Sequence, residues 1–88
     1  MIDRIGRIAF LNALVEFKSA RISSIELTNI AYNYTEVNDI GLKGLAWEIV
    51  WECGEDDYLA RGIDCPMMKR AMDFLESEEI EWHGWTGE

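Results

Sequence analysis

The stretch from Asp64 to Trp82, DCPMMKRAMDFLESEEIEW, constrains the fold most, because it joins the chain's only proline to its most regular apolar spacing. Asp64 can cap a helix N-terminus, and Pro66 is tolerated in a first helical turn. Apolar residues then recur at i, i+3, i+4 and i+7, the spacing of one helix face, at Met68, Ala71, Met72 and Leu75. This spacing predicts an amphipathic helix that lies on a core.

The N-terminal segment, Ile2 to Ser19, predicts a helix with two apolar faces. One face holds Ile2, Gly6, Ala9, Phe10, Ala13 and Phe17, and the other holds Ile8, Leu11 and Val15. Narrow polar strips separate the two faces: Asp3, Arg7 and Lys18 on one side, Asn12 and Glu16 on the other. Such a helix is either central to the domain or offers one face to a partner, so we predict homodimer contacts at Ile8, Leu11 and Val15.

A second helix has the clearest start signal in the chain. Ser23 and Glu26 form a capping box, and Ile22 with Leu27 has the spacing of a hydrophobic staple. We expect this helix to run to about Thr35 as an ordinary amphipathic helix.

The middle of the chain is ambiguous. Residues 37–44, VNDIGLKG, have the composition of a connection. Residues 45–53, LAWEIVWEC, alternate well as a strand, whereas as a helix they place Glu48, Glu52 and Glu55 in one stripe. We favour the helix, because its neighbours are helical and Asp39 can cap a longer one.

Together these signals predict one mainly α domain, residues 1–88, that ends in a short β-arm, since the pattern after Glu79 changes to period two. An α+β fold with residues 45–53 as a strand is the alternative. At 88 residues a single core is small, so a subunit interface can contribute much of the stability.

Residues 59–82 resemble the second helix, recognition helix and wing entry of a winged helix-turn-helix domain. In that family the recognition helix follows a pattern of the type V-x-R-A-L-x-x-L-E, and the matching positions here are Met68, Arg70, Ala71, Met72, Leu75 and Glu76. The resemblance implies a winged-helix fold and, as one function, a dimeric transcriptional regulator that contacts DNA through Lys69, Arg70 and the basic first helix. Three features depart from the family: Glu79 stands where it usually has a glycine, the preceding helix is about a residue too short, and only two basic groups face outward.

Charge argues against that function. The formal net charge is −9, yet residues 1–22 carry four basic and two acidic side chains, so the acidity belongs to the rest of the chain. Two acidic clusters stand out: Glu48, Glu52, Glu55, Asp56 and Asp57, then Glu76, Glu78, Glu79 and Glu81. Phosphate backbones repel such a domain, whereas basic protein surfaces attract it.

The sequence contains no clear metal-binding or catalytic motif. Cys53, Cys65 and His83 lack the spacing of a zinc site. We read the cysteines as free thiols in a reducing cytoplasm, and a single disulfide is the alternative. No glycine-rich loop or nucleophile stands beside a carboxylate pair, so we expect no enzymatic activity, no cofactor and no metal. The apolar runs are also too short to span a membrane.

We therefore expect a small acidic cytoplasmic regulator or inhibitor that binds a basic protein. The two acidic clusters would dock on that partner, with Trp85 as an apolar anchor. One such partner is a nucleic-acid-handling protein whose DNA or RNA site this protein would occupy. The comparison is an analogy with small acidic phage inhibitors. A purely structural oligomerisation subunit is a further alternative.

Overall fold

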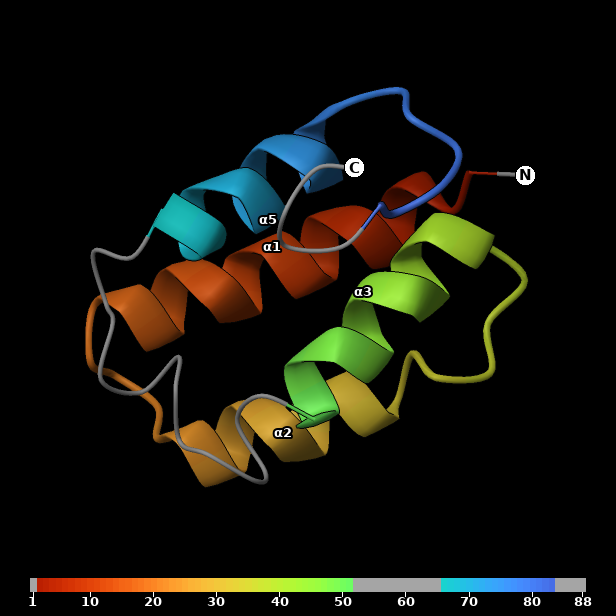
Figure 1. Ribbon diagram of the computed structural model, residues 1–88. Coiled ribbons are helices and arrows are strands. Elements are labelled where there is room, and N and C mark those ends of the chain that lie inside the picture. The colour runs from red at the N-terminus through yellow and green to blue at the C-terminus, as the bar shows by residue number, and fades with distance from the viewer. Residues whose placement is uncertain (1, 52–65, 84–88) are drawn as a thin grey trace.

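The computed structural model describes residues 2–51 and 66–83, and four helices form this part of the protein. They are α1 (Arg4–Lys18), α2 (Ser24–Tyr32), α3 (Ile40–Trp51) and α5 (Pro66–Glu76). Figure 1 shows α1 across the middle, with α5 running antiparallel along one side and α2 along the other, while α3 packs on α2. The prediction of a mainly α protein is confirmed for the described residues.

Local sequence signals fix the ends of α1. The Asp3 side chain accepts a hydrogen bond from the Gly6 N–H at 2.9 Å and so caps the N-terminus. At the other end, the Ala20 N–H donates to the Phe17 carbonyl and the Arg21 N–H to the Glu16 carbonyl, which is the Schellman pattern. Ala20 takes the left-handed conformation there, with φ of 61°, at a position where glycine is usual.

Helix α2 begins as predicted. The Ser23 side chain accepts from the Glu26 N–H and the Glu26 carboxylate accepts from the Ser23 N–H, both at 3.1 Å, so the capping box is confirmed. The helix ends at Tyr32, three residues before the predicted end.

Helix α3 settles the ambiguity in the middle of the chain. Residues 45–51 are helical, so the strand alternative is wrong for them, and the prediction of a connection over 37–44 is wrong from Ile40 onward. Gly41 is explained by close packing. A Cβ at Gly41 would lie 2.6 Å from the Ile80 carbonyl oxygen and from Phe74, so this glycine serves a close approach and not a turn.

One hydrophobic core joins the four helices. Its buried members are Phe10, Ala13, Leu14 and Phe17 from α1, Leu27 and Ala31 from α2, Leu42, Leu45, Ala46, Ile49 and Val50 from α3, and Met68, Ala71, Phe74 and Leu75 from α5. The predicted stripe of α5 is therefore buried at Met68, Ala71 and Leu75, while Met72 is only half-buried. In the described ranges no helix is both long and apolar enough to cross a bilayer.

The segment after α5 differs from the predicted β-arm as far as it can be followed. Residues 80–83 form no strand and instead pass beside the first half of α3. Residues 84–88, where the arm was expected to continue, lie outside the described residues. The winged-helix resemblance also begins outside them, at residues 59–65, and stays a prediction.

Candidate functional site

A buried ion pair holds three elements together beneath the surface. Arg7 is 0% exposed and Asp39 is 1% exposed. The Arg7 guanidinium donates twice to the Asp39 carboxylate, from Nε to Oδ2 at 2.7 Å and from Nη2 to Oδ1 at 2.9 Å. It also lies over the Phe74 ring, 4.6 Å from its centroid. Arg7, predicted to lie in a polar strip at the helix surface, is instead part of the interior.

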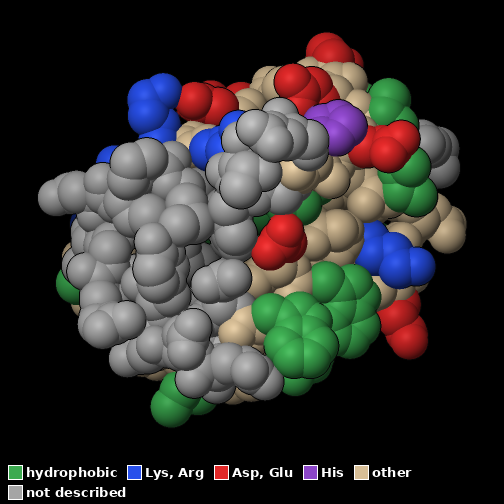
Figure 2. Space-filling view, viewed as in Figure 1, with side chains coloured by type: hydrophobic (Ala, Val, Ile, Leu, Met, Phe, Trp, Pro, Cys, Tyr) green, Lys and Arg blue, Asp and Glu red, His purple; other side chains and the backbone are tan. Residues whose placement is uncertain are grey.

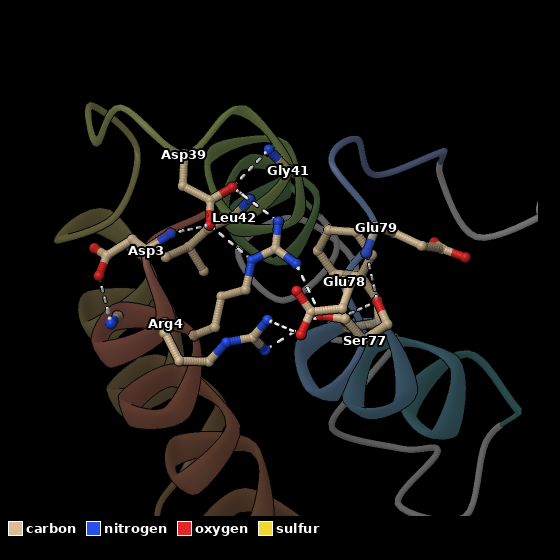
Figure 3. A network of polar contacts seen from close by, with 11 residues as sticks. Asp3, Arg4, Asp39, Gly41, Leu42, Ser77, Glu78 and Glu79 are labelled. Carbon is tan, nitrogen blue, oxygen red and sulfur yellow. Dashed lines mark hydrogen bonds and ion pairs between the residues drawn. The ribbon is translucent and has the colours of Figure 1, made fainter. Parts of the chain in front are cut away.

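Backbone groups complete the shell around Asp39. Figure 3 shows N–H groups directed at the carboxylate: Asp3 donates to Oδ2 at 2.9 Å, and Gly41 and Leu42 each donate to Oδ1 at 3.1 Å. Asp39 thus caps α3, as its position suggested. Burial alone would raise the pKa of Asp39, but the hydrogen bonds from Arg7, Asp3 and Leu42 outweigh it and lower the pKa to about 2.

This ion pair is a structural element. The Asp39 carboxylate stays ionised at neutral pH and all its acceptor positions are in use, so it cannot serve as a general acid or bind a further donor. Within residues 2–51 and 66–83, no cluster of three His, Cys, Asp or Glu side chains is placed to hold a metal ion.

The same network fixes the chain just after α5. The Ser77 carbonyl accepts from Arg4 Nη1 at 3.2 Å, and Arg4 Nη2 forms an ion pair with Glu78 at 2.6 Å (Figure 3). From there the chain passes α3, with the Ile80 carbonyl against Gly41 and the Trp82 side chain against Gly44. Trp82 packs edge-on against Phe74, with ring centroids 5.2 Å apart. Residues 77–82 are therefore held in one place relative to α3.

The outward face of α3 is aromatic. Ile40, Gly44, Trp47 and Trp51 follow one another at steps of four, three and four, so they form one stripe. Trp82 covers the stripe at Gly44, whereas Trp47 is 42% exposed and Trp51 is 60% exposed. Figure 2 shows hydrophobic side chains gathered over α3, with acidic side chains on the same face of the molecule.

Acidic side chains are exposed on the segment that passes α3 at Gly41 and Gly44. Glu79 and Glu81 are exposed on the segment that passes the first half of α3, and Glu76 and Glu78 are exposed just before it. We call Trp47, Trp51, Glu79 and Glu81 the aromatic–acidic surface. Glu48 is half-buried on α3, next to the stripe. The other predicted partner-binding residues, Glu52, Glu55, Asp56, Asp57 and Trp85, lie outside the described residues.

The two basic side chains proposed for DNA contact have partners within the protein. Lys69 donates to Asp73 at 2.8 Å, one helical turn along α5, and this hydrogen bond raises the pKa of Lys69. The Arg70 guanidinium lies 5.6 Å from the centroid of the Trp82 ring. His83 is exposed, and the two cysteines lie outside the described residues.

The residues predicted to dimerise differ in their exposure. Ile8 and Val15 point outward from α1, whereas Leu11 is half-buried against the core. The structure adds Ile5, which is 83% exposed on the same side of α1.

No family model, curated protein or solved structure matches this chain. The site is therefore characterised by its own geometry: a small helical protein with a fixed aromatic stripe beside carboxylates. Sequence reasoning missed the Arg7–Asp39 pair and the exposure of Ile5 and Ile40. One available signal was that Arg7 continues the 3-4-3 spacing of Phe10, Leu14 and Phe17, which marks the buried face of α1.

Proposed function

We propose that this protein is a non-enzymatic regulator that binds a basic protein partner through the aromatic–acidic surface. The observation that carries the proposal is the position of Trp47 and Trp51, exposed on one stripe of α3, beside a segment that presents Glu79 and Glu81. Tryptophan is enriched among the residues that dominate binding energy at protein interfaces, since it buries a large area at a low entropy cost.

The carboxylates define the chemistry of the partner. Glu79 and Glu81 are exposed on the segment that passes the first half of α3, in a chain of net charge −9, so they attract basic surfaces and accelerate encounter with them. An amphipathic partner segment, with apolar side chains for the tryptophans and Lys or Arg for the glutamates, satisfies both parts of the surface.

A basic surface of this kind is typical of proteins that handle nucleic acids. Occupation of their DNA or RNA site by an acidic protein would block it, so we infer an inhibitory role. Direct DNA binding is the weaker candidate, because Lys69 is engaged by Asp73 and Arg70 lies against Trp82, and several free Lys or Arg groups usually carry DNA affinity.

Affinity capture with matched variants tests the proposal. The protein, immobilised through its N-terminus, is exposed to lysate, and captured proteins are compared among the wild type, Trp47→Ala/Trp51→Ala and Glu79→Gln/Glu81→Gln. A basic protein that is retained by the wild type and lost from both variants supports the proposal. Ile25→Ala, at an exposed isoleucine of α2, is the control and should retain it.

A DNA titration supplies the opposing result. The proposal predicts no binding to mixed duplex DNA at low salt. Binding that weakens steeply with salt and is lost in Lys69→Gln/Arg70→Gln would instead establish the DNA-binding alternative and overturn ours. Capture that is unchanged by the tryptophan and glutamate variants would also overturn it.

A further inference from the structure

One end of the aromatic–acidic surface is set by two contacts of the segment after α5. The Ile80 carbonyl oxygen lies against Gly41, and the Trp82 side chain lies against Gly44. Glu81 stands between these two contacts in the chain, so it is held beside the first half of α3. The other exposed carboxylate of the surface directly precedes Ile80 and belongs to the same end.

The tryptophans form the other end of the surface. Trp47 and Trp51 are exposed one turn apart in the second half of α3. The midpoint between Gly41 and Gly44 and the midpoint between the two tryptophans are about 6.5 residues apart, which is about 10 Å along a helix axis. Figure 2 shows most acidic side chains of this face along its upper edge and the largest hydrophobic group below them. Carboxylates and tryptophans are therefore separated along α3 and not interspersed.

The acidic end selects Lys or Arg side chains. Besides its carboxylates it exposes aliphatic surface, because Ile40 is 54% exposed at the start of α3 and Ile80 is 51% exposed between Glu79 and Glu81 in the chain. Lys and Arg suit such a mixture, since their aliphatic stems cover apolar surface while their charged heads reach carboxylates. A purely apolar partner side chain would cover the isoleucines but would leave the carboxylates without a counter-charge.

The tryptophan end selects large apolar side chains. Two exposed indoles one turn apart offer an apolar area on which Leu, Met or an aromatic side chain gains most from burial. Within Ile40–Trp51 the one carboxylate is Glu48, which is half-buried. The carboxylates of the acidic end lie about 10 Å away, beyond the Debye length of about 8 Å in physiological salt, so they attract a cation at the tryptophans only weakly.

We propose that the aromatic–acidic surface binds a linear segment of its partner that carries Lys or Arg at one end and large apolar side chains at the other, about 10 Å apart. In an extended segment this separation corresponds to about three residues. The inference rests on the proposed function and adds the pattern of the partner, in which basic and apolar residues are segregated. A linear segment fits because the exposed residues of α3 follow one narrow stripe.

Fluorescence anisotropy with labelled peptides tests this pattern. The segregated peptide joins Arg-Arg to Leu-Phe through a Gly-Ser-Gly spacer and is made in both chain directions; the mixed peptide has the same composition, with one arginine and one apolar residue at each end. The wild type should bind the better segregated peptide at least about 10-fold more tightly than the mixed one, because only the former engages both ends of the surface. Trp47→Ala should weaken that binding about 10-fold, whereas Tyr32→Ala, at an exposed tyrosine of α2, should leave it unchanged.

Charge reversal tests the acidic end. Glu79→Lys/Glu81→Lys should lose the segregated peptide and gain binding to a peptide with Glu-Glu in place of Arg-Arg, while Asp73→Lys, at an exposed carboxylate of α5, should behave like the wild type. Circular dichroism verifies the fold of each variant, and the peptide comparison itself needs only the wild type.

Three outcomes would each overturn the inference: equal binding of the segregated and mixed peptides, no binding of either, or no gain of binding on charge reversal. Capture of a basic protein that depends on the tryptophans and glutamates would still support the proposed function in those cases. Failure of the segregated pattern is thus distinguishable from failure of the proposed function.

Discussion

Removal of the Asp39 charge provides the sharpest test of the fold. The variant Asp39→Asn keeps the size of the side chain and one oxygen for capping α3, but it leaves the fully buried Arg7 guanidinium without its counter-charge. Breaking a buried ion pair by removing one partner costs about 3–5 kcal/mol, mostly because the remaining charge stays buried. An 88-residue domain has a stability on the order of 4–13 kcal/mol, so this one change removes much of it.

A double-mutant cycle isolates the pair. Arg7→Met leaves the Asp39 carboxylate with three backbone N–H donors, so we expect a loss of about 3 kcal/mol. The double variant Arg7→Met/Asp39→Asn contains no unpaired buried charge, and its loss should be close to that of either single variant. The coupling energy is therefore expected at about 2–3 kcal/mol.

Urea unfolding, followed by circular dichroism and tryptophan fluorescence, measures all four proteins. With a slope of about 1 kcal/mol per molar, typical of a small domain, each single variant should lower the midpoint by about 3 M. Where a variant is unfolded without urea, an added osmolyte restores a measurable transition. Lys69→Met/Asp73→Asn removes an ion pair of similar length at the surface and should change the midpoint little. Additive single variants, or a loss below about 1 kcal/mol for Asp39→Asn, would refute the buried pair.

Three other predictions follow from the geometry. The folded-state pKa of Asp39 is lowered from 3.8 to about 2, so about 2 kcal/mol of stability is present above pH 3.8 and is lost as the pH falls to 2. Over this pH range the urea midpoint of Asp39→Asn should therefore fall less than that of the wild type. Gly41→Ala places a methyl 2.6 Å from Phe74 and should destabilise the protein by about 1–3 kcal/mol. Gly44→Ala makes only an ordinary contact at 3.5 Å and should stabilise α3 by up to about 1 kcal/mol. A Gly41→Ala protein as stable as the wild type would contradict the close approach. Ala20→Gly should raise the thermal midpoint, with a gain of up to about 1 kcal/mol, because glycine adopts the left-handed conformation without strain; a lowered midpoint would argue against a φ of 61°.

Local signals in the sequence located the helices well. The Ser23–Glu26 capping box fixed the start of α2, and the apolar spacing from Met68 to Leu75 identified the buried face of α5. These predictions succeeded because a cap and a helical stripe depend only on residues within a few positions of each other. The end of α2 was misplaced by three residues, since Thr35 is buried just beyond the helix and gives no stop signal in the sequence.

Long-range pairing could not be predicted in the same way. Arg7 and Asp39 are 32 residues apart, and nothing between them indicates that a charge on the helix would be buried. Gly41 resembled a turn residue, since the sequence alone does not distinguish a glycine required by close packing from one required by a turn. The exposed face of α1 was predicted only in part, for a related reason. Asn12 was read as a divider between apolar faces, while the structure places it in line with Ile5, Ile8 and Val15.

The buried ion pair connects the fold to the proposed interface. Arg7 and its neighbour Arg4 hold the Ser77 carbonyl, while Asp39 sets the first turn of α3. The segment that carries Glu79 and Glu81 thus has a fixed position relative to the tryptophan stripe before any partner arrives. Preorganisation of this kind lowers the entropy cost of binding, which matters for a surface built on few residues.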